Sequence, residues 1–240
     1  MAKSTASLGE VYELMLGRYG PQYWWPADSW FEMMVGAVLT QSAAWTNVEK
    51  AIGNLKSAGK LSPEAIRATP QDELATLVYP SGYYNAKARK LKALAEYLGT
   101  TWGDDIDAMT REGLVPLRLE LLGVHGVGEE TADDILLYAL DKPVFVIDAY
   151  TRRLVDRLGL APWEDRYSAY QALFMERLEP DAEMYGEYHA LIVRHAKEGC
   201  RKKAPLCNGC VLQEVCPTGR GGGGDWRRSG SRNGGGTLPF

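Results

Sequence analysis

Apolar residues recur along most of this chain at the three- and four-residue spacing of amphipathic helices. The clearest case runs from Ser29 to Leu39. Ser29 and Glu32 form a capping box at its start, where each side chain can satisfy a free backbone amide of the other. The apolar side chains that share the following helical face are Phe31, Met34, Val35, Val38 and Leu39. We expect this segment to be the central buried helix of the fold.

A second well-marked helix follows a glycine-rich hinge at Val124–Gly128. Its apolar residues, again at helical spacing, are Ala132, Ile135, Leu136 and Ala139. Acidic residues load its first turns, as the helix dipole prefers. The hinge glycines allow backbone conformations that a side chain would forbid, and they leave the first amides of the helix uncovered. An anion such as a phosphate can therefore approach this hinge.

The rest of the chain also predicts helices. Ser62-Pro63 and Thr69-Pro70 each place a capping residue before a proline at the first helical position. Further helical segments follow Tyr84 and, later in the chain, cover 154–158, 167–178 and 185–197. The one strand-like run, 144–147, is short and follows a proline, so we interpret it as an extended connection. The predicted fold class is all-α.

Composition bounds the class of protein. The chain has 240 residues, of which 45% are apolar, enough for the core of one large domain or two small ones. No apolar run approaches the length of a membrane span, and the first ten residues lack the apolar stretch of a signal peptide, so we expect a cytoplasmic protein with no membrane contact. Residues 218–240 are rich in glycine and arginine and are predicted to be a disordered tail.

The net charge and the distribution of charge lead to different expectations about a nucleic-acid partner. The formal net charge of -4 argues mildly against a nucleic-acid partner, since such proteins tend to have an electropositive face. Basic residues nevertheless cluster in three places, which are Lys87 with Arg89, Lys90 and Lys92, then Arg152 with Arg153 and Arg157, then Arg201 with Lys202 and Lys203. Each cluster alone could be an ordinary solvated face.

All four cysteines lie in one short segment with the spacing C-x6-C-x2-C-x5-C, at Cys200, Cys207, Cys210 and Cys216. A disulfide framework would staple distant parts of a secreted chain, whereas four thiols this close suit a metal centre. Structural zinc sites usually pair two short knuckles, and only Cys207 and Cys210 form one here. Iron-sulfur clusters accept looser spacings.

Two polar residues follow apolar runs. Asp148 comes directly after Val146-Ile147 and precedes a helical segment, which is also how an ordinary helix N-cap looks. Gln41 follows the central helix and, without further context, would be a surface amide at a helix end.

These features together resemble the endonuclease III superfamily of DNA glycosylases. The resemblance rests on the hairpin from Leu121 to Ala132, the Val146-Ile147-Asp148 segment, the Gly82-Tyr83-Tyr84-Asn85 element and the cysteine spacing, and it covers roughly residues 25 to 217. It implies a two-part helical fold: 25–135 forms a barrel with the helix-hairpin-helix, and 1–24 plus 136–217 form an iron-sulfur domain. It also implies a groove between them for double-stranded DNA that contains a damaged base. We expect a monomer.

The resemblance assigns roles to individual residues. It makes Asp148 the catalytic carboxylate, which stabilises positive charge on the sugar and orients the attacking water. It makes the four cysteines the ligands of a [4Fe-4S] cluster. The implied DNA-binding residues are Gln41, Gly126, Val127, Gly128, Glu130 and Thr131.

The chain departs from the family at one position that matters for the reaction. Family members that also nick the strand carry a lysine where this chain has Glu130, and a carboxylate cannot form a Schiff base. The prediction is therefore a monofunctional glycosylase. Two alternatives stay open: a bifunctional glycosylase/lyase acting on oxidised pyrimidines, and a DNA-binding or redox-signalling protein that has lost catalysis.

Tryptophans suggest the substrate. Trp24 and Trp25 precede the central helix and Trp45 follows Gln41, although aromatic residues this dense more often build a core. Alkylated purines such as 3-methyladenine carry positive charge in DNA and are attracted to indole faces. Trp24-Trp25-Pro26 and the hairpin are similar to the endonuclease III-like 3-methyladenine glycosylases, so these three tryptophans and Lys197 are assigned to a base pocket. The alternative for Lys197 is a partner of the helix dipole.

Overall fold

The computed structural model describes residues 6–221, and most of the predicted tail, from 222 onward, lies outside them. Within 6–221 the chain forms twelve α-helices and one 3-10 helix, and no strand. The all-α prediction is confirmed. None of the described helices has both the length and the apolar character that crossing a membrane requires.

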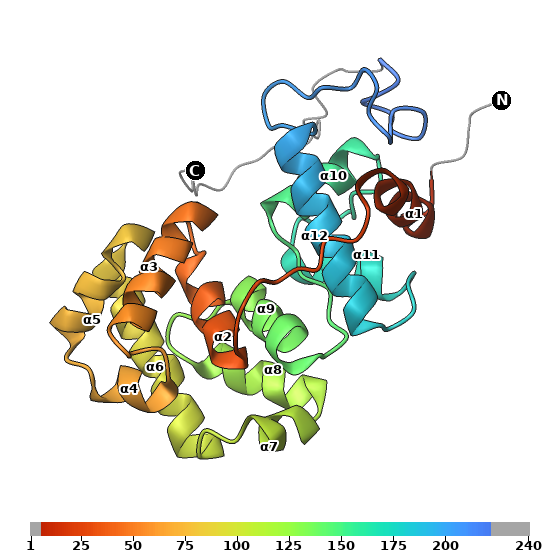
Figure 1. The fold of residues 1–240 in the computed structure, drawn as a ribbon. Coiled ribbons are helices and arrows are strands. Elements are labelled where there is room, and N and C mark those ends of the chain that lie inside the picture. Colours follow the sequence, from red (N-terminus) through yellow and green to blue (C-terminus); the bar gives the residue numbers. More distant parts are fainter. Residues whose placement is uncertain (1–5, 222–240) are drawn as a thin grey trace. The chain divides into compact units, whose positions relative to one another are not determined.

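The described residues divide into two compact units, whose ribbons Figure 1 shows. Trp25–Val144 form the first, called here the hairpin unit. Residues 6–24 and 145–221 form the second, called here the cysteine unit. The sequence-based limit of the barrel at residue 135 falls inside a helix, Glu129–Leu140, which the hairpin unit keeps whole.

The hairpin unit is built around one helix, α2 (Trp30–Leu39). Every residue of α2 from Phe31 to Leu39 is buried, as the apolar pattern predicted, and α2 packs against three other helices of the unit. The remaining elements of the unit are α3 (Trp45–Ser57), α4 (Pro63–Ala68), α5 (Gln71–Leu77), η1 (Tyr79–Ser81), α6 (Tyr84–Trp102), α7 (Ile106–Arg111), α8 (Leu114–Gly123) and α9 (Glu129–Leu140).

The structure contains one of the two hydrogen bonds of the capping box predicted at the start of α2. The Ser29 hydroxyl accepts from the Glu32 amide at 3.2 Å. The Glu32 carboxylate reaches back to the Asp28 amide at 3.1 Å, one residue before the cap, and pairs with the Lys56 ammonium at 2.7 Å. This buried carboxylate therefore has partners on both sides, which offsets the cost of removing it from water.

One predicted helix start was wrong by one residue. Ser62 caps α4 as expected, but Pro70 rather than Thr69 occupies the cap of the next helix, α5. Thr69 instead ends α4, where its hydroxyl donates to the Ala65 carbonyl at 2.6 Å. A threonine between two short helices can serve either one, and its burial favours the bond back to α4.

The cysteine unit contains α1 (Leu8–Tyr19), α10 (Ala149–Arg157), α11 (Tyr167–Met175) and α12 (Ala182–Glu198), with α12 packed against both α1 and α10. Its core is aromatic: the Phe145 ring stacks on Phe174 at 3.9 Å and meets Tyr185 and Tyr188 edge-on.

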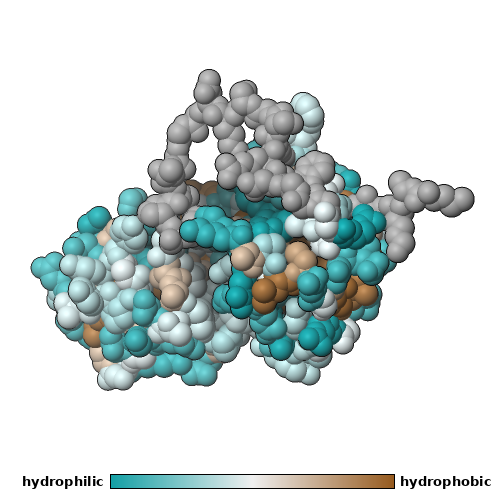
Figure 2. Space-filling view, turned by 90° about the horizontal axis from the view of Figure 1, so that it is seen from above, coloured by the Kyte–Doolittle hydropathy of each residue, from teal (hydrophilic) through white to brown (hydrophobic). Residues whose placement is uncertain are grey.

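The face of the molecule that Figure 2 shows is mostly hydrophilic or neutral, with small apolar patches.

The run 144–147 is an extended connection, as predicted, and α11 satisfies its backbone. Gln171 Nε2 donates to the Phe145 carbonyl at 2.8 Å, and the Ile147 amide donates to the Tyr167 hydroxyl at 3.2 Å. Buried backbone groups need such partners, and here side chains provide what a neighbouring strand would provide in a sheet. The connection is thereby held in one conformation immediately before Asp148.

Candidate functional site

The hairpin joins α8 to α9 through a tight turn at Val124–Gly128. Gly126 has φ of +85°, a left-handed conformation that favours glycine. Gly128 is the N-cap of α9, and because it has no side chain it gives no capping hydrogen bond to the first-turn amides. A Cβ at Gly128 would meet nothing within 4 Å. The amino end of α9 is therefore open on this side, and its dipole favours an anion there.

The Val127, Thr131 and Glu130 side chains differ in placement. Val127 and Thr131 are buried, so Val127 offers an external partner only its backbone. Glu130 is exposed in the first turn of α9, where an acidic residue suits the helix dipole. No amine occupies the position at which a Schiff-base lysine would stand.

Gln41 lies in the loop 40–44 between α2 and α3, called here the Gln41 loop. Its Nε2 donates to the Gly126 carbonyl at 3.0 Å and to the Thr131 hydroxyl at 2.9 Å, and its Oε1 accepts from the Lys90 ammonium. The structure thus brings three predicted DNA-binding residues together with Lys90, which sequence reasoning had placed only in a basic cluster.

Asp148 stands at the end of the extended connection and caps α10. Its Oδ1 accepts from the Thr151 amide at 2.7 Å, so the N-cap interpretation holds for this oxygen. Its Oδ2 lies 3.6 Å from His189 Nε2 on α12, and the Asp148 side chain is 14% exposed. Burial raises the pKa of Asp148, but His189 and the Thr151 amide outweigh it, so the pKa lies below its ordinary value. Asp148 is therefore ionised at neutral pH.

Sequence reasoning missed His189. It is a buried histidine on α12 and faces the carboxylate from an element distant in sequence. The sequence contains only one signal for this residue, which is that histidine is rare in the chain, with three in all. A lone histidine in a helix with buried apolar neighbours more often serves the core than a site.

The structure brings two of the predicted pocket tryptophans together. The rings of Trp25 and Trp45 meet edge-on at 5.3 Å, and Tyr138 of α9 joins them at 5.5 Å from Trp25. Trp25 also covers Gly36 of α2, whose Cβ position lies 3.3 Å from the indole. Both tryptophans are only partly buried. We call Trp25, Trp45 and Tyr138 the aromatic trio.

Trp24 and Lys197 belong to the other unit. Trp24 is partly buried in the segment that follows α1. Lys197 is exposed in the last turn of α12, where a cation complements the helix dipole, so the simpler interpretation of Lys197 also fits its place.

Helix α10 forms hydrogen bonds with the cysteine segment. Arg157 Nη1 lies 2.9 Å from Cys200 Sγ, and Arg153 Nε donates to the Cys200 carbonyl at 2.9 Å. The thiol of Cys216 donates to the Arg157 carbonyl at 3.3 Å. Asp148 caps one end of α10, and Arg157 at the other end contacts two of the four cysteines, Cys200 and Cys216.

The four thiols have the donor chemistry of a cluster site. Burial raises the pKa of Cys210 and of Cys216, and the charges of the neighbouring cysteines raise both further. Between residues 6 and 221, no three histidine, cysteine, aspartate or glutamate side chains are gathered closely enough to hold a metal ion. The donor set fits a thiolate-bound centre, and its coordination geometry is not formed in this structure.

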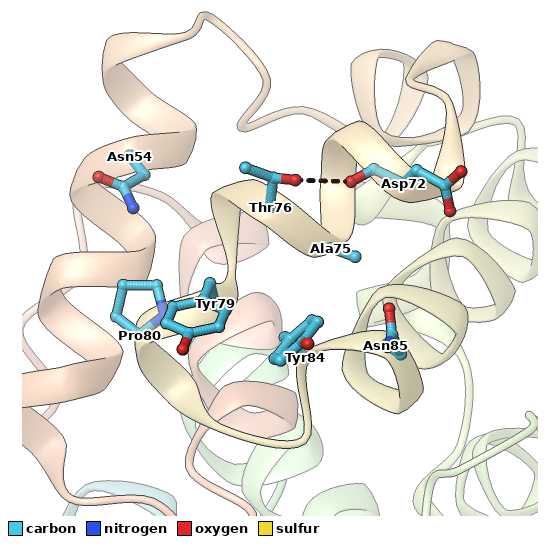
Figure 3. A pocket seen from close by; sticks show the side chains of 8 residues that line it. All are labelled: Asn54, Asp72, Ala75, Thr76, Tyr79, Pro80, Tyr84 and Asn85. Atoms are coloured by element: carbon cyan, nitrogen blue, oxygen red, sulfur yellow. Dashed lines mark hydrogen bonds between the residues drawn. The ribbon is translucent and has the colours of Figure 1, made fainter.

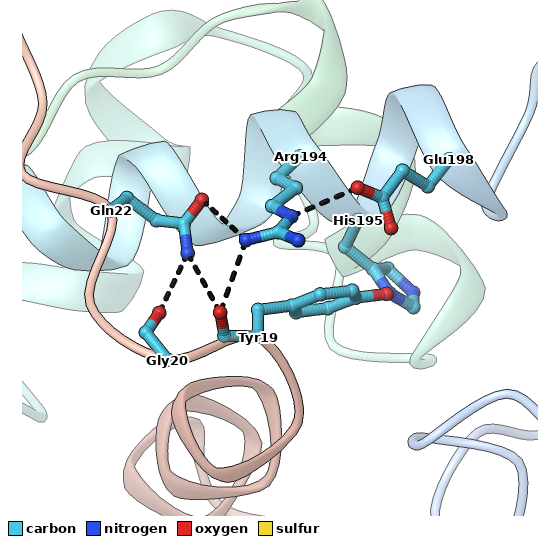
Figure 4. A network of polar contacts seen from close by, with 6 residues as sticks. All are labelled: Tyr19, Gly20, Gln22, Arg194, His195 and Glu198. Carbon is cyan, nitrogen blue, oxygen red and sulfur yellow. Dashed lines mark hydrogen bonds and ion pairs between the residues drawn. The ribbon is translucent and has the colours of Figure 1, made fainter.

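His195 supports this segment from α12. Its Nδ1 lies 2.9 Å from the Tyr19 hydroxyl and its Nε2 3.8 Å from Cys210 Sγ. Burial lowers the pKa of His195 to about 4, so the ring is neutral near pH 7 and carries one donor and one acceptor nitrogen. Figure 4 shows Tyr19 beside His195, with Arg194 and Gln22 completing the contact between the end of α1 and α12.

A cavity elsewhere in the hairpin unit contains none of the predicted site residues. It has a volume of about 540 Å³ and opens between α3, α5 and the start of α6. Tyr79 and Tyr84 line it with their rings 4.8 Å apart, and Asn54, Asp72 and Asn85 add polar groups (Figure 3).

Comparisons with known proteins agree with this arrangement. Residues 35–180 match the HhH-GPD superfamily of base excision DNA repair proteins. MJ1434 of Methanocaldococcus jannaschii, named as a DNA repair glycosylase, is 46% identical over 208 residues, which are 86% of this chain and 94% of that protein. Endonuclease III of Thermotoga maritima is 29% identical over 187 residues, which are 78% of this chain and 82% of that protein.

A solved structure is similar over nearly the same extent. It is the H. pylori 3-methyladenine DNA glycosylase bound to 1,N6-ethenoadenine, with a TM-score of 0.70 and 29% identity, covering 80% of this chain and 98% of that one. The family match covers more than half of the chain, and the M. jannaschii relative is matched over almost its whole length. This chain therefore belongs to the endonuclease III, or HhH-GPD, superfamily of base excision DNA repair glycosylases.

Proposed function

We propose that this protein is a monofunctional DNA N-glycosylase that removes an alkylated purine such as 3-methyladenine. The observation that carries the proposal is the Asp148 carboxylate, which His189 and the Thr151 amide keep ionised although it is largely buried. An ionised carboxylate in such surroundings can stabilise a developing positive charge far better than one in water.

The reaction requires a base that has left the duplex stack, because the glycosidic bond is out of reach inside it. A 3-methylated adenine already carries positive charge, so it leaves as a neutral base with the electron pair of the C1′–N bond. Asp148 stabilises the cationic sugar that remains. It then accepts a proton as water adds to C1′, and an abasic site results. No protonation of the leaving base is needed, which suits a site whose carboxylate is ionised.

The aromatic trio supports the choice of an alkylated purine. A cation placed over indole faces gains roughly 1 to 2 kcal/mol when it is desolvated, and a neutral base gains none of this. The similarity to a 3-methyladenine glycosylase that was crystallised with a modified adenine points to the same substrate class.

Glu130 supports a monofunctional reaction. A lyase step needs an amine that attacks the sugar to form an imine, and the exposed first turn of α9 offers a carboxylate there. The second candidate is a bifunctional reaction on oxidised pyrimidines, and the 29% identity with endonuclease III of T. maritima is the observation that favours it.

The remaining predicted residues have places in this proposal. The open amino end of α9 would hold a DNA phosphate through backbone amides, and the Gln41 loop would contact the duplex. Cys200, Cys207, Cys210 and Cys216 would hold a [4Fe-4S] cluster, which when bound supplies a four-way cross-link to the C-terminal segment.

The test is incubation of the purified protein with duplexes that each contain one lesion, scoring abasic sites separately from strand nicks. We expect 3-methyladenine release without nicking, and no covalent adduct after borohydride. Trp25→Ala should weaken this release more than it weakens binding to an abasic duplex, whereas Trp30→Ala, another partly buried tryptophan of the same unit, should affect neither. Excision of thymine glycol with efficient borohydride trapping would support the bifunctional alternative instead.

A further inference from the structure

The side chain of Lys90, on α6, packs against Gly126 of the hairpin. A Cβ built on Gly126 would lie 2.6 Å from Lys90 Cδ and 2.8 Å from Cε, with Cγ closer still. Real Cβ atoms do not approach other atoms so closely, so the aliphatic stem of Lys90 occupies the space that a side chain at Gly126 would need. The hairpin can lie this close to α6 only because residue 126 is glycine.

The ammonium of Lys90, which is partly buried, contacts Gln41. It donates to Gln41 Oε1, while the two N–H groups of the same amide go to the Gly126 carbonyl and the Thr131 hydroxyl. Every donor of the Gln41 side chain is thus used inside the protein. The next residue, Ser42, has φ of +53°, a conformation that a non-glycine residue adopts only when its surroundings hold it there.

A second lysine anchors the same helix beside this contact. Lys87 is 2% exposed, and its ammonium donates to the Leu39 carbonyl at 2.9 Å and to the Ser81 carbonyl at 2.6 Å. Burial, and after it the charge of Lys90, lowers the pKa of Lys87 to about 8. Lys87 fixes α6 to the last turn of α2, immediately before the Gln41 loop.

We propose that Lys90 is a positioning residue that ties the hairpin and the Gln41 loop to α6, so that these two segments meet DNA as one rigid surface. The role rests on the proposed function only in assigning both segments to the DNA. Lys90 acts through Gln41 and Gly126, and its ammonium makes no phosphate contact of its own.

The variant that tests this is Lys90→Met, which keeps most of the stem under Gly126 and removes the ammonium. Lys92→Met is its matched control, because Lys92 lies on the same helix, is also partly buried and donates to a backbone carbonyl, that of Arg67, at 2.9 Å. Each variant removes one positive charge. Any general effect of charge on DNA affinity is therefore common to both.

The first readout needs no DNA. Hydrogen exchange of the free protein should become about tenfold faster in Lys90→Met at both 40–44 and 124–128, and at neither segment in Lys92→Met. Unchanged exchange at these segments would overturn the link between them, whatever the protein's activity. Faster exchange would support the link even if no lesion is excised, so its failure and that of the proposed function are distinguishable.

The second readout is affinity for an abasic duplex. We expect Lys90→Met to bind about tenfold more weakly than Lys92→Met, with equal slopes against salt concentration. Gln41→Ala should weaken binding similarly, and the double variant should be no weaker than either single one, since both changes break the same link. Additive losses, or a slope lower by about one in Lys90→Met alone, would show a direct phosphate contact and would overturn the positioning role.

Discussion

The two oxygens of Asp148 have separate tasks. Oδ1 caps α10 through the Thr151 amide, and Oδ2 faces His189 from a buried position. A capping carboxylate holds its own orientation, because rotation of the side chain would break the bond to the helix. The cap and the chemical group are therefore one residue, and a substitution must be chosen to separate the two roles.

Asp148→Asn makes this separation. Asparagine caps helices about as well as aspartate, so the fold should be kept. The lost charge should raise the activation free energy of excision by ~3 kcal/mol or more, and the excision rate should fall accordingly. Single-turnover excision rates and thermal unfolding measure the two effects. Asp181→Asn is the control, because Asp181 caps α12 through the Met184 amide at 3.0 Å in the same way. An Asp148→Asn protein with full activity would reduce Asp148 to a helix cap.

His189→Phe should change the pH dependence. Without the imidazole, burial raises the pKa of Asp148 with less to oppose it, so the acidic limb of kcat/KM should move to higher pH. The sign for stability follows. A carboxyl group whose pKa is lowered by folding stabilises the fold at pH values above its ordinary pKa of about 3.9, and this stabilisation is lost as the pH falls through the lowered pKa of the folded state. His189→Phe should therefore lower the stability at neutral pH and change it little at low pH.

The control for this prediction is the double variant with Asp148→Asn. If His189 acts through the carboxylate, adding His189→Phe to Asp148→Asn should cost less stability at neutral pH than it costs the wild type. An acidic limb that stays where it is in the wild type would contradict the assignment.

At this scale the sequence singles out the residues for which we propose a chemical role, and it misses the residues that contact them. Asp148, Gln41 and the cysteines stand in local patterns with recognisable spacing. His189 and Lys90 acquire their roles from partners on other helices, and nothing in their own neighbourhood marks this. Lys87 was placed in a basic cluster with Arg89, Lys90 and Lys92 for the same reason, although the structure buries it.

Among the elements, the hairpin depends on two glycines for different reasons. Gly126 needs its left-handed conformation and the space that Lys90 fills, whereas Gly128 has φ of -100° and empty space at its Cβ position. The first glycine serves the packing of the hairpin onto α6. The second keeps the amino end of α9 open.

Substitution with alanine should distinguish the two. Gly126→Ala should destabilise the protein by about 2 to 4 kcal/mol, from a strained backbone and overpacking against Lys90. Gly128→Ala should leave stability within about 0.5 kcal/mol and weaken abasic-DNA binding, because its methyl group would stand where a phosphate approaches. Urea unfolding and DNA affinity give the two measurements. The opposite assignment of effects would contradict this account of the hairpin.

Helices whose signals are local were predicted well. The capping box and apolar face of Ser29–Leu39 gave the buried central helix, because one strong cap and one apolar face leave little choice of end or orientation. The boundary between α4 and α5 was misplaced because Thr69 can cap one helix or end another. That choice depends on packing, which the sequence does not display.

The cysteine unit combines two segments that are far apart in the sequence. Residues 6–24 and 145–221 fold together, so α1 packs on α12 and the Tyr19 hydroxyl lies 2.9 Å from His195 Nδ1. Asp148, α10 and the cysteine segment belong to this same unit. Helix α10 connects the candidate catalytic carboxylate to Cys200 and Cys216 through Arg157. A change at the cysteines can therefore reach the helix that Asp148 caps.

This connection gives a prediction for the cysteine centre. The purified protein should be brown and contain about four irons per chain, as four thiolates hold in a [4Fe-4S] centre. Cys210→Ser should lose the iron and its absorbance. Hydrogen exchange should then rise in 198–218 and in the last turn of α10, while α2 keeps its protection, because α2 belongs to the other compact unit.

Two results would contradict it. A colourless, fully active protein that contains zinc would mean that the thiols form a structural zinc site, which the donor set also permits. Iron loss without faster exchange in α10 would mean that Arg157 does not transmit the state of the cysteine segment to this helix. In the expected case, excision should fall together with iron content while the hairpin unit stays folded, since the helix capped by Asp148 would lose the partner that holds its far end.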